Sequence, residues 1–377
     1  MKRASIFTVG ALLAAIALVA PAAAQDQGTQ DNISYGGTSG EFLLLGAGAR
    51  GLALGGAYAA LTTDVSALYY NPAGLAQMER PGVMVSSYSY LVETKYFWGG
   101  AAFPLSGGSR AIGVSLGSFG FGDQKVYTLD DPDGTSGRSY DVRQTYVGGT
   151  YAQNLSDRFS AGLTVKLISD QLGDVSADAF ALDIGTNFHA TVGQRAIRAA
   201  FTIQNLGTPL RHDGQALNVG ATRIPPLGTV DVPQEVQPAR LRTSEWPLPV
   251  MFRVGVAFDA VSQAANRITV LGEFTQPNNT KPGAGLGLEW MGTNLGGSGF
   301  SLAARGSYTV NPDNNIDDIN LGSLSSAESS GSFTSDGLAL GGGVMYARNS
   351  WEVGVDYAYK SFGPLGGTNN FSVSLSW

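Results

Sequence analysis

The 377-residue sequence contains no cysteine, which excludes disulfides, cysteine nucleophiles and thiolate metal sites, as well as a lipid-modified N-terminal cysteine. Histidine is also scarce, with only His189 and His212. A hydrolase would need a histidine gathered with a serine and a carboxylate or amide. His189 shares a predicted strand face with Asn187 but lies beside a turn, and His212 falls in a long loop. We therefore expect no enzymatic activity.

Charged residues make up 14% of the chain, against ~25% in ordinary soluble domains. After the first 20 residues no apolar run approaches the ~20 residues that a membrane-spanning helix needs. The acidic excess argues against nucleic acid as a partner. The short acidic run Asp313, Asp317 and Asp318 is typical of a solvated loop, so we expect no metal ion and no cofactor.

The first 24 residues predict an export signal. Lys2 and Arg3 precede a fifteen-residue apolar stretch over 6–20, and the small residues 22–24 form a cleavage pattern after Pro21. The stretch is too short to span a bilayer. Cleavage after Ala24 would leave 21 basic and 30 acidic residues. We expect a flexible leader over 25–40, rich in Gln, Asp, Gly, Ser and Thr.

From Pro81 to the last residue, apolar and polar residues alternate. Side chains of a β-strand point to opposite faces in turn, so alternation predicts strands with one apolar and one polar face. Near the C-terminus, Phe371, Val373, Leu375 and Trp377 alternate with serines. We predict fourteen strands, near 82–90, 96–103, 110–119, 140–153, 158–170, 178–189, 195–205, 248–258, 266–275, 282–291, 299–310, 336–347, 350–360 and 369–377.

The connections between these strands also alternate. The long ones, 120–139, 206–247 and 311–335, follow the third, seventh and eleventh strands, so all three fall at the same end. The connections at the other end are short, as in bacterial outer-membrane barrels with short periplasmic turns. With 52 glycines and frequent aromatics, this predicts an all-β fold: a 14-stranded antiparallel transmembrane β-barrel over 81–377, with a short, partly helical N-terminal plug over 41–80. A β-sandwich or secreted β-solenoid, the alternatives, would not produce this alternation. The proline-rich stretch 224–249 is expected in the largest external loop.

The polar stripes place nine charged residues on the inner face of the barrel. A strongly selective ion pore would show one dominant sign, whereas four are positive and five negative. We expect them to pair with one another or with the plug; a mixed polar lining is the alternative. The lumen-facing charges are Lys166, Asp183, Arg198, Arg253, Glu273, Glu289, Arg305, Glu352 and Asp356.

The segment 41–80 is rich in Ala, Leu and Gly and lacks strand alternation. Gly46, Gly48 and Gly51 form a GxGxxG pattern after a short apolar run. A dinucleotide site would need an acidic residue ~20 positions further on, within a βαβ unit. Asp64 lies thirteen residues after Gly51 and no such unit follows. We interpret the glycines as allowing close packing against a barrel wall.

Two blocks in this segment resemble the N-terminal signature of the FadL-like outer-membrane barrels, and within that group the PorV/PorQ branch. The blocks are residues 50–57 and 64–75 of the sequence. Their matching positions are Arg50, Gly55, Gly56, Asp64, Asn71, Pro72, Ala73 and Gly74. The resemblance implies fourteen strands and a hatch that fills the lumen. Asn71–Pro72 independently suits a tight turn; an ordinary turn without functional movement is the alternative.

The resemblance also implies localisation and partners. It places the chain in the outer membrane of a Gram-negative-type bacterium, in contact with lipid. The last strand resembles the signal that the barrel-assembly machinery reads, carried here by Phe371, Val373, Leu375 and Trp377. PorV/PorQ proteins serve type IX secretion, which implies secretion-system proteins or exported cargo as partners. FadL-type channels instead take up hydrophobic small molecules. The modest chain length favours the secretion role.

Overall fold

The computed structural model describes residues 36–105, 108–222, 236–310 and 337–377. The predicted signal peptide, most of the predicted leader, the acidic run at 313–318 and the prolines at 225, 226 and 233 lie outside these residues. Within them, no helix has the length and apolar character to cross a membrane.

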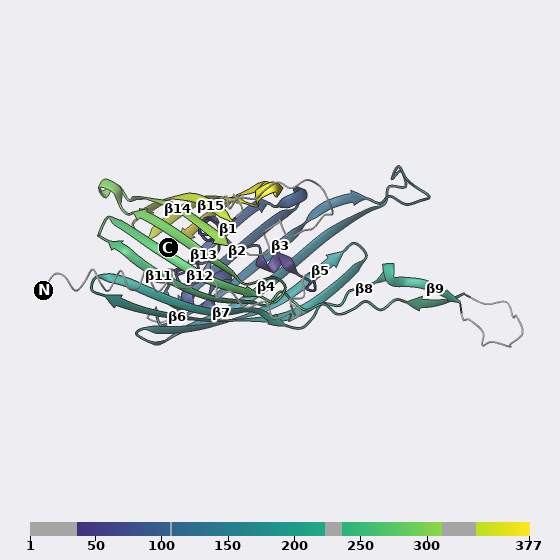
Figure 1. Cartoon of the computed structure of the whole chain (residues 1–377), viewed down its shortest axis with the longest axis horizontal. Coiled ribbons are helices and arrows are strands. Elements are labelled where there is room, and N and C mark those ends of the chain that lie inside the picture. The colour runs from purple at the N-terminus through teal and green to yellow at the C-terminus, as the bar shows by residue number, and fades with distance from the viewer. Residues whose placement is uncertain (1–35, 106–107, 223–235, 311–336) are drawn as a thin grey trace, which may run out of the picture. The chain divides into compact units, whose positions relative to one another are not determined.

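Fourteen long strands form one closed antiparallel barrel (Figure 1). Each strand pairs with the next along the chain, β7 pairs with β11, and β1 closes the barrel against β17. The prediction of a 14-stranded barrel is confirmed. The strands are β1 (Gly82–Ser89), β2 (Lys95–Leu105), β3 (Arg110–Lys125), β4 (Ser139–Ser156), β5 (Phe159–Leu172), β6 (Val175–Val192), β7 (Arg195–Gly207), β11 (Met251–Ser262), β12 (Asn266–Pro277), β13 (Gly283–Gly292), β14 (Phe300–Val310), β15 (Leu338–Arg348), β16 (Trp351–Ser361) and β17 (Gly367–Ser376).

Side chains alternate between the two faces of the wall. On β16, Val353 and Val355 point outward and are exposed, whereas Asp356 and Ala358 point inward and are buried. Val355 lies opposite Val373 of β17, so the outward apolar stripes of neighbouring strands coincide. This exterior suits lipid, because a polar wall would lose its hydration there.

The connections define two ends of the barrel. At the short-turn end the strands are joined by residues 106–109, 157–158, 193–194, 263–265, 293–299 and 349–350. At the long-loop end they are joined by 90–94, 126–138, 173–174, 208–250, 278–282, 311–337 and 362–366. The connection 208–250 contains β8 (Asp213–Gly214), the 3-10 helix η5 (Gln215–Leu217) and the two-stranded sheet of β9 (Asn218–Thr222) and β10 (Val236–Arg240). Among the described residues, short 3-10 helices also lie in other connections: η3 (Leu91–Glu93), η6 (Leu295–Gly297) and η9 (Gly363–Leu365).

The eighth barrel strand is displaced from its prediction. It was expected over 248–258, whereas β11 runs over Met251–Ser262. Pro247 and Pro249 cannot donate a ladder hydrogen bond, so this sequence disfavours an earlier start. The prediction followed hydrophobicity through Val250 and stopped one residue before Asp259, which lies on the inner face of the strand.

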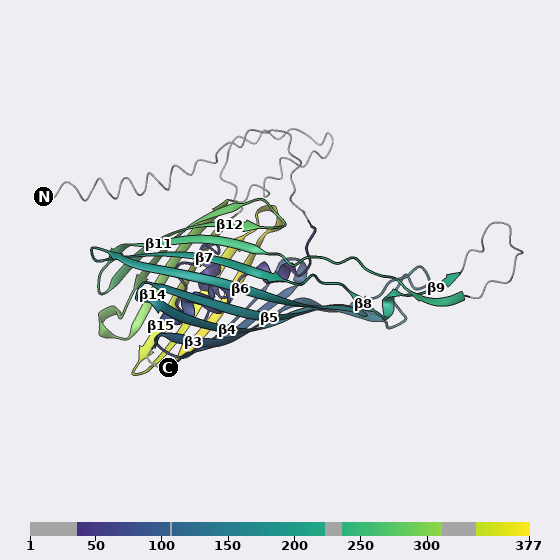
Figure 2. The same ribbon diagram turned by 90° about the horizontal axis from the view of Figure 1, so that it is seen from below.

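Residues 41–80, which we call the plug, lie within the barrel (Figure 2). They form η1 (Glu41–Leu44), α2 (Ala49–Ala53), α3 (Ala67–Tyr70) and η2 (Pro72–Gln77). Most plug side chains are buried, including Phe42, Leu54, Tyr58 and Leu68. Helices this short are not stable alone, so their conformation depends on contacts with the surrounding wall.

Candidate functional site

The Asn71–Pro72 turn is held from both sides. Asn71 adopts an extended conformation, as expected before proline, and its side-chain oxygen accepts a hydrogen bond from the Ala73 N–H at 3.1 Å. Its side-chain nitrogen donates to Ala59 O within the plug and to Thr186 O of β6. One asparagine therefore caps η2 and ties the plug to the barrel wall.

The wall receives this turn in a notch made by two glycines. Gly162 of β5 and Gly185 of β6 are direct cross-strand partners. A Cβ on Gly162 would lie 2.4 Å from the carbonyl carbon of Pro72, and one on Gly185 would lie 2.2 Å from Oδ1 of Asn71. Any side chain at either position would collide with the turn, so the notch depends on glycine.

Glycines elsewhere on the wall allow similar close contacts. A Cβ on Gly113 of β3 would lie 2.5 Å from Leu68, and one on Gly341 of β15 would lie 2.5 Å from Ala53. A Cβ on Gly285 of β13 would lie 3.2 Å from the Cβ of Ala57. The high glycine content therefore has one structural use in packing the plug against widely separated strands.

Ion pairs join the plug to the inner wall. Arg50 of α2 donates two hydrogen bonds of 2.8 Å to Glu289 of β13 and one of 3.0 Å to Asp64. Glu289 is fully buried and also accepts from Arg305 at 2.7 Å, which in turn donates to Asp356. Buried charges are tolerated when paired and hydrogen-bonded, and this paired network holds α2 in place.

A second set of ion pairs lies on the neighbouring wall. Arg253 of β11 pairs with Glu273 of β12 at 3.0 Å and donates to Gly56 O of the plug. Glu273 also accepts a hydrogen bond from the N–H of Ala59. Lys166 pairs with Asp183 at 2.7 Å, completing a run of charge pairs along the wall.

The nine predicted lumen charges fall into two groups. Eight take part in ion pairs, with Arg198 binding Asp259 of β11 at 3.1 Å. Glu352 has no ion pair among the residues that the structure describes. Sequence reasoning missed Asp259 and Arg267, and Arg267 lies 3.6 Å from Glu289. Both have inward strand positions. Extending the alternation by one residue would have found Asp259, and Arg267 has the inward parity of its predicted strand.

Tyr69 ties the beginning of the plug to its third helix. Its phenolic oxygen accepts a hydrogen bond from Gly46 N–H and donates one to Leu43 O, each at 2.9 Å. Burial raises the pKa of Tyr69 to about 12, so the donated hydrogen bond persists at neutral pH. The first glycine of the GxGxxG pattern therefore serves internal packing of the plug.

The predicted barrel-assembly residues lie on the outer face. Phe371 and Val373 of β17 are exposed, and Leu375 shares their face. The ring of Trp377 lies 6.1 Å from that of Trp351 and 6.4 Å from that of Phe103. The end of the chain thereby continues the outward stripe of the closing strand.

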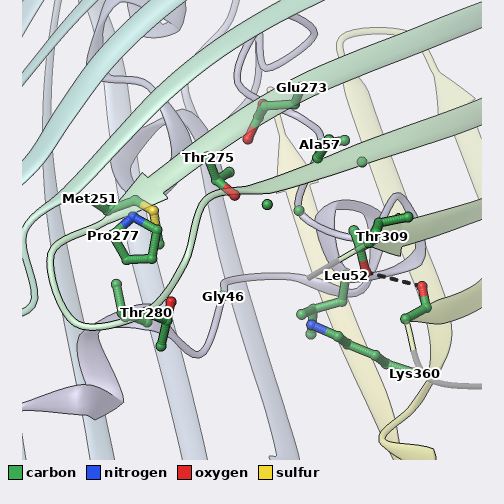
Figure 3. Close-up of a pocket in the computed structure, with 18 of the residues that line it drawn as sticks. Gly46, Leu52, Ala57, Met251, Glu273, Thr275, Pro277, Thr280, Thr309 and Lys360 are labelled. Atoms are coloured by element: carbon green, nitrogen blue, oxygen red, sulfur yellow. Dashed lines mark hydrogen bonds between the residues drawn. The ribbon is translucent and has the colours of Figure 1, made fainter. Parts of the chain in front are cut away.

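A pocket of about 520 Å³ lies between the plug and the wall at the long-loop end (Figure 3). The side of the plug is formed by η1, by Leu52 and by the segment Gly55–Ala57. The facing wall comes from β11 to β14 and from β16 with their connections. Apolar lining residues include Leu44, Leu45, Leu52, Ala57, Met251, Pro277, Val310 and Leu365.

Charged groups occupy defined places in this pocket. The Arg253–Glu273 pair lies among its lining residues, already satisfied by mutual contact. Glu41, Lys281 and Lys360 line other parts, and the Lys360 ammonium lies 5.4 Å from the ring centre of Phe362. The remaining apolar surface is suited to a hydrophobic molecule of modest size, since ligand pockets typically measure ~300–1,000 Å³.

The histidines form no hydrolytic relay. His212 lies 3.4 Å from the buried carboxylate of Asp170, but Ser39 donates to that same carboxylate and not to His212. His189 lies on β6, where its ring Nδ1 has no hydrogen-bond partner. No cluster of three or more metal-binding side chains occurs among the described residues.

No family model and no curated protein matches the sequence. Solved structures do match its fold. The monoaromatic hydrocarbon channel CymD aligns with a TM-score of 0.53 and 13% identity, over 89% of this chain and 97% of that one. The Pseudomonas putida toluene transporter TodX gives 0.53 and 12%, over 88% and 98%. The Ralstonia pickettii toluene transporter TbuX gives 0.52 and 13%, over 88% and 97%. The chain thus has a FadL-like fold.

Proposed function

We propose that this chain is an outer-membrane channel that takes up small hydrophobic molecules, such as aromatic hydrocarbons or fatty acids. The observation that carries the proposal is the pocket of about 520 Å³ between plug and wall, with the apolar side chains that line part of it. Among the solved structures that share this fold, CymD is a monoaromatic hydrocarbon channel, and TodX and TbuX are toluene transporters. This support favours uptake over the PorV/PorQ-type role that the chain length suggested.

The pocket explains how a hydrophobic molecule would be captured. Burial of apolar surface contributes roughly 25 cal/mol per Å², and the leucines of the plug provide such surface at the long-loop end. In our proposal this end faces the cell exterior, and the short turns face the periplasm. The outward apolar stripes contact outer-membrane lipid, and the last strand presents Phe371 and Trp377 to the barrel-assembly machinery.

Passage beyond the pocket requires the plug to rearrange. We place the moving part at Gly55 and Gly56, which line the pocket and adopt positive φ angles of 66° and 79°. Wall contacts hold this segment through the hydrogen bond of Arg253 to Gly56 O and that of Ser307 to Ala53 O. In contrast, the Asn71–Pro72 turn is clamped by the glycine notch and would stay fixed.

A secretion role of the PorV/PorQ type is the second candidate. The observation that favours it is the number of contacts that fasten the plug, because a barrel that serves as a docking platform needs no open lumen. The connection 208–250 and its β9–β10 sheet would then supply the surface for exported cargo or secretion-system proteins.

Filling the pocket tests the uptake proposal. Thr275 of β12 points into the pocket (Figure 3), and its neighbour Gln276 lies on the opposite face of the strand. We expect Thr275→Trp to lower toluene and fatty-acid uptake by whole cells at least about fivefold, because an indole occupies the volume that the substrate needs.

Gln276→Trp is the matched control, since it places the same side chain on the same strand but outside the lumen. Its uptake should equal that of the unaltered protein at equal amounts of folded barrel. Normal uptake by both variants would show that the pocket is not on the transport path.

A further inference from the structure

Aromatic side chains mark one membrane boundary near the short-turn end. Outward-facing rings pair there: Phe300 with Tyr346 at 4.6 Å and Trp351 with Trp377 at 6.1 Å, with Phe103 packed against Trp377. Phe300 and Trp351 are about half exposed, at 47% and 52%. Aromatic belts of membrane proteins sit at the level of the lipid head groups. The head-group layer is therefore expected beside these rings.

Arginines lie on the same outer face at this end of the barrel, two of them (Arg110 and Arg348) on strands that carry or adjoin these rings. Arg110 and Arg195 are the first residues of β3 and β7, and Arg348 is the last residue of β15. Each stands an even number of residues from an outward apolar side chain of its strand, such as Ile112, Phe201 or Tyr346. Arg348 is also the direct cross-strand partner of Trp351. We call Arg110, Arg195 and Arg348 the rim arginines; all three are exposed.

The rim arginines lie far apart around the barrel. In the strand order, three strands separate β3 from β7, and four separate β7 from β15. Arg80 and Arg158 add exposed basic groups at the same end, before β1 and in the β4–β5 turn. In the part of the chain that the structure describes, no ion pair involves any of these five arginines.

The short-turn end is basic although the chain as a whole has a net charge of −7. Beside these five unpaired arginines, its acidic residues are Glu79, Asp157 and Glu352. The described residues of the long-loop end carry both signs: acidic side chains (Glu93, Asp123, Asp130, Asp131, Asp133, Asp141, Asp174, Asp213 and Glu245) are accompanied by basic ones (Lys95, Lys125, Arg138, Arg143, Arg211, Arg240 and Arg242). Among the described residues, basic side chains therefore outnumber acidic ones at the short-turn rim.

We propose that the rim arginines bind the phosphate groups of anionic phospholipids, of the phosphatidylglycerol type, in the leaflet at the short-turn end. A planar guanidinium donates two parallel hydrogen bonds to a phosphate. Basic residues near a membrane surface attract anionic lipids. The inference rests on the proposed membrane location and is independent of what the channel transports.

The position of the arginines favours lipid over a soluble partner. Their strand positions lie on the outward face of the wall, and Arg110 and Arg348 lie near the aromatic rings, whereas a periplasmic protein or cell-wall polymer would meet the tips of the turns. Their spread around the barrel also suits several separate lipid molecules better than one compact ligand.

A lipid-selection experiment tests this proposal. The full barrel is placed in nanodiscs of equal parts phosphatidylcholine and phosphatidylglycerol, and native mass spectrometry measures the ratio of the lipids that remain bound. We expect the unaltered protein to enrich phosphatidylglycerol, and the triple variant Arg110→Gln, Arg195→Gln, Arg348→Gln to lose at least about fivefold of that enrichment.

The matched control removes three exposed basic groups from the long-loop end: Lys125→Gln, Arg138→Gln and Arg242→Gln. It should keep the enrichment. The proposal is overturned if the rim variant enriches phosphatidylglycerol as strongly as the unaltered protein, or if the control loses as much enrichment as the rim variant. It is also overturned if the rim variant loses binding to cell-wall polymer while its lipid enrichment is unchanged. The three single rim variants, each expected to show a smaller loss, provide the same test if the triple variant does not insert. Heat-dependent electrophoretic mobility verifies folding, so failure of barrel insertion is distinguished from failure of lipid binding.

Discussion

Replacing Glu289 by glutamine is expected to destabilise the barrel by about 3–5 kcal/mol, the usual cost of leaving buried charges without their partner. Glu289 accepts hydrogen bonds from Arg50 of the plug and from Arg305 of the wall, and its side chain is fully buried. Glutamine keeps the shape but carries no charge, so it leaves both guanidinium groups undercompensated. Asp64 and Asp356 retain part of the pairing, which favours the lower end of the range.

The free energy of unfolding in guanidinium chloride, followed by the mobility of unheated samples in electrophoresis, measures this effect. Glu245→Gln is the control, because Glu245 also pairs with an arginine, Arg211 at 3.2 Å, but is about half exposed. Exposed pairs contribute at most about 1 kcal/mol. Equal stability of the two variants would show that the buried network does not hold the plug.

The second large effect is expected at the glycine notch. A methyl group at position 162 would lie 2.4 Å from the backbone of Pro72 and 2.5 Å from the nitrogen of Ala73. Backbone atoms cannot swing aside as a long side chain can, so Gly162→Ala should displace the Asn71–Pro72 turn. Overpacking typically costs about 1–3 kcal/mol, and we expect the upper part of that range.

Displacement of the turn should also loosen the lumen. We expect Gly162→Ala to raise ion conductance in planar bilayers several-fold above that of the unaltered barrel. Gly149→Ala is the control, because Gly149 lies on the adjacent strand β4 with open space where its Cβ would be. If both variants conduct alike, the notch has no part in sealing the barrel.

The barrel was predictable from sequence because its determinants are local. Each strand carries its own two-residue period, and each connection has a length that can be read directly. The stripe at Trp351–Tyr359 and the serine alternation at Phe371–Trp377 therefore identified β16 and β17. The predicted boundaries of the eighth strand were wrong at both ends: prolines, including Pro249, precede its actual start, and the inward charge of Asp259 lies just beyond its predicted end.

The interior of the barrel was less accessible to sequence reasoning. The alternation along its strand predicts that Glu289 points inward. Its ion pair with Arg50, however, joins residues 239 positions apart in the sequence. The role of Gly162 is equally nonlocal, since it depends on where the turn at Pro72 comes to rest. Sequence alone showed an excess of glycine and a nearly balanced set of lumen-facing charges. The structure shows which of these glycines and charges contact the plug.

Local sequence patterns also could not decide between an uptake role and a secretion role. The motif from Arg50 to Gly74 resembles the FadL-like barrels and, within that group, the PorV/PorQ branch, and chain length also favoured secretion. The pocket beside Leu52 and Ala57 exists only once plug and wall are assembled. This arrangement shifts the proposal toward a channel.

Deletion of the gene with two paired assays tests the central claim most directly. We expect cells lacking the protein to take up toluene or fatty acids several-fold more slowly, while the set of proteins displayed on the cell surface is unchanged. Unchanged uptake together with loss of displayed proteins would contradict the channel and support the secretion role.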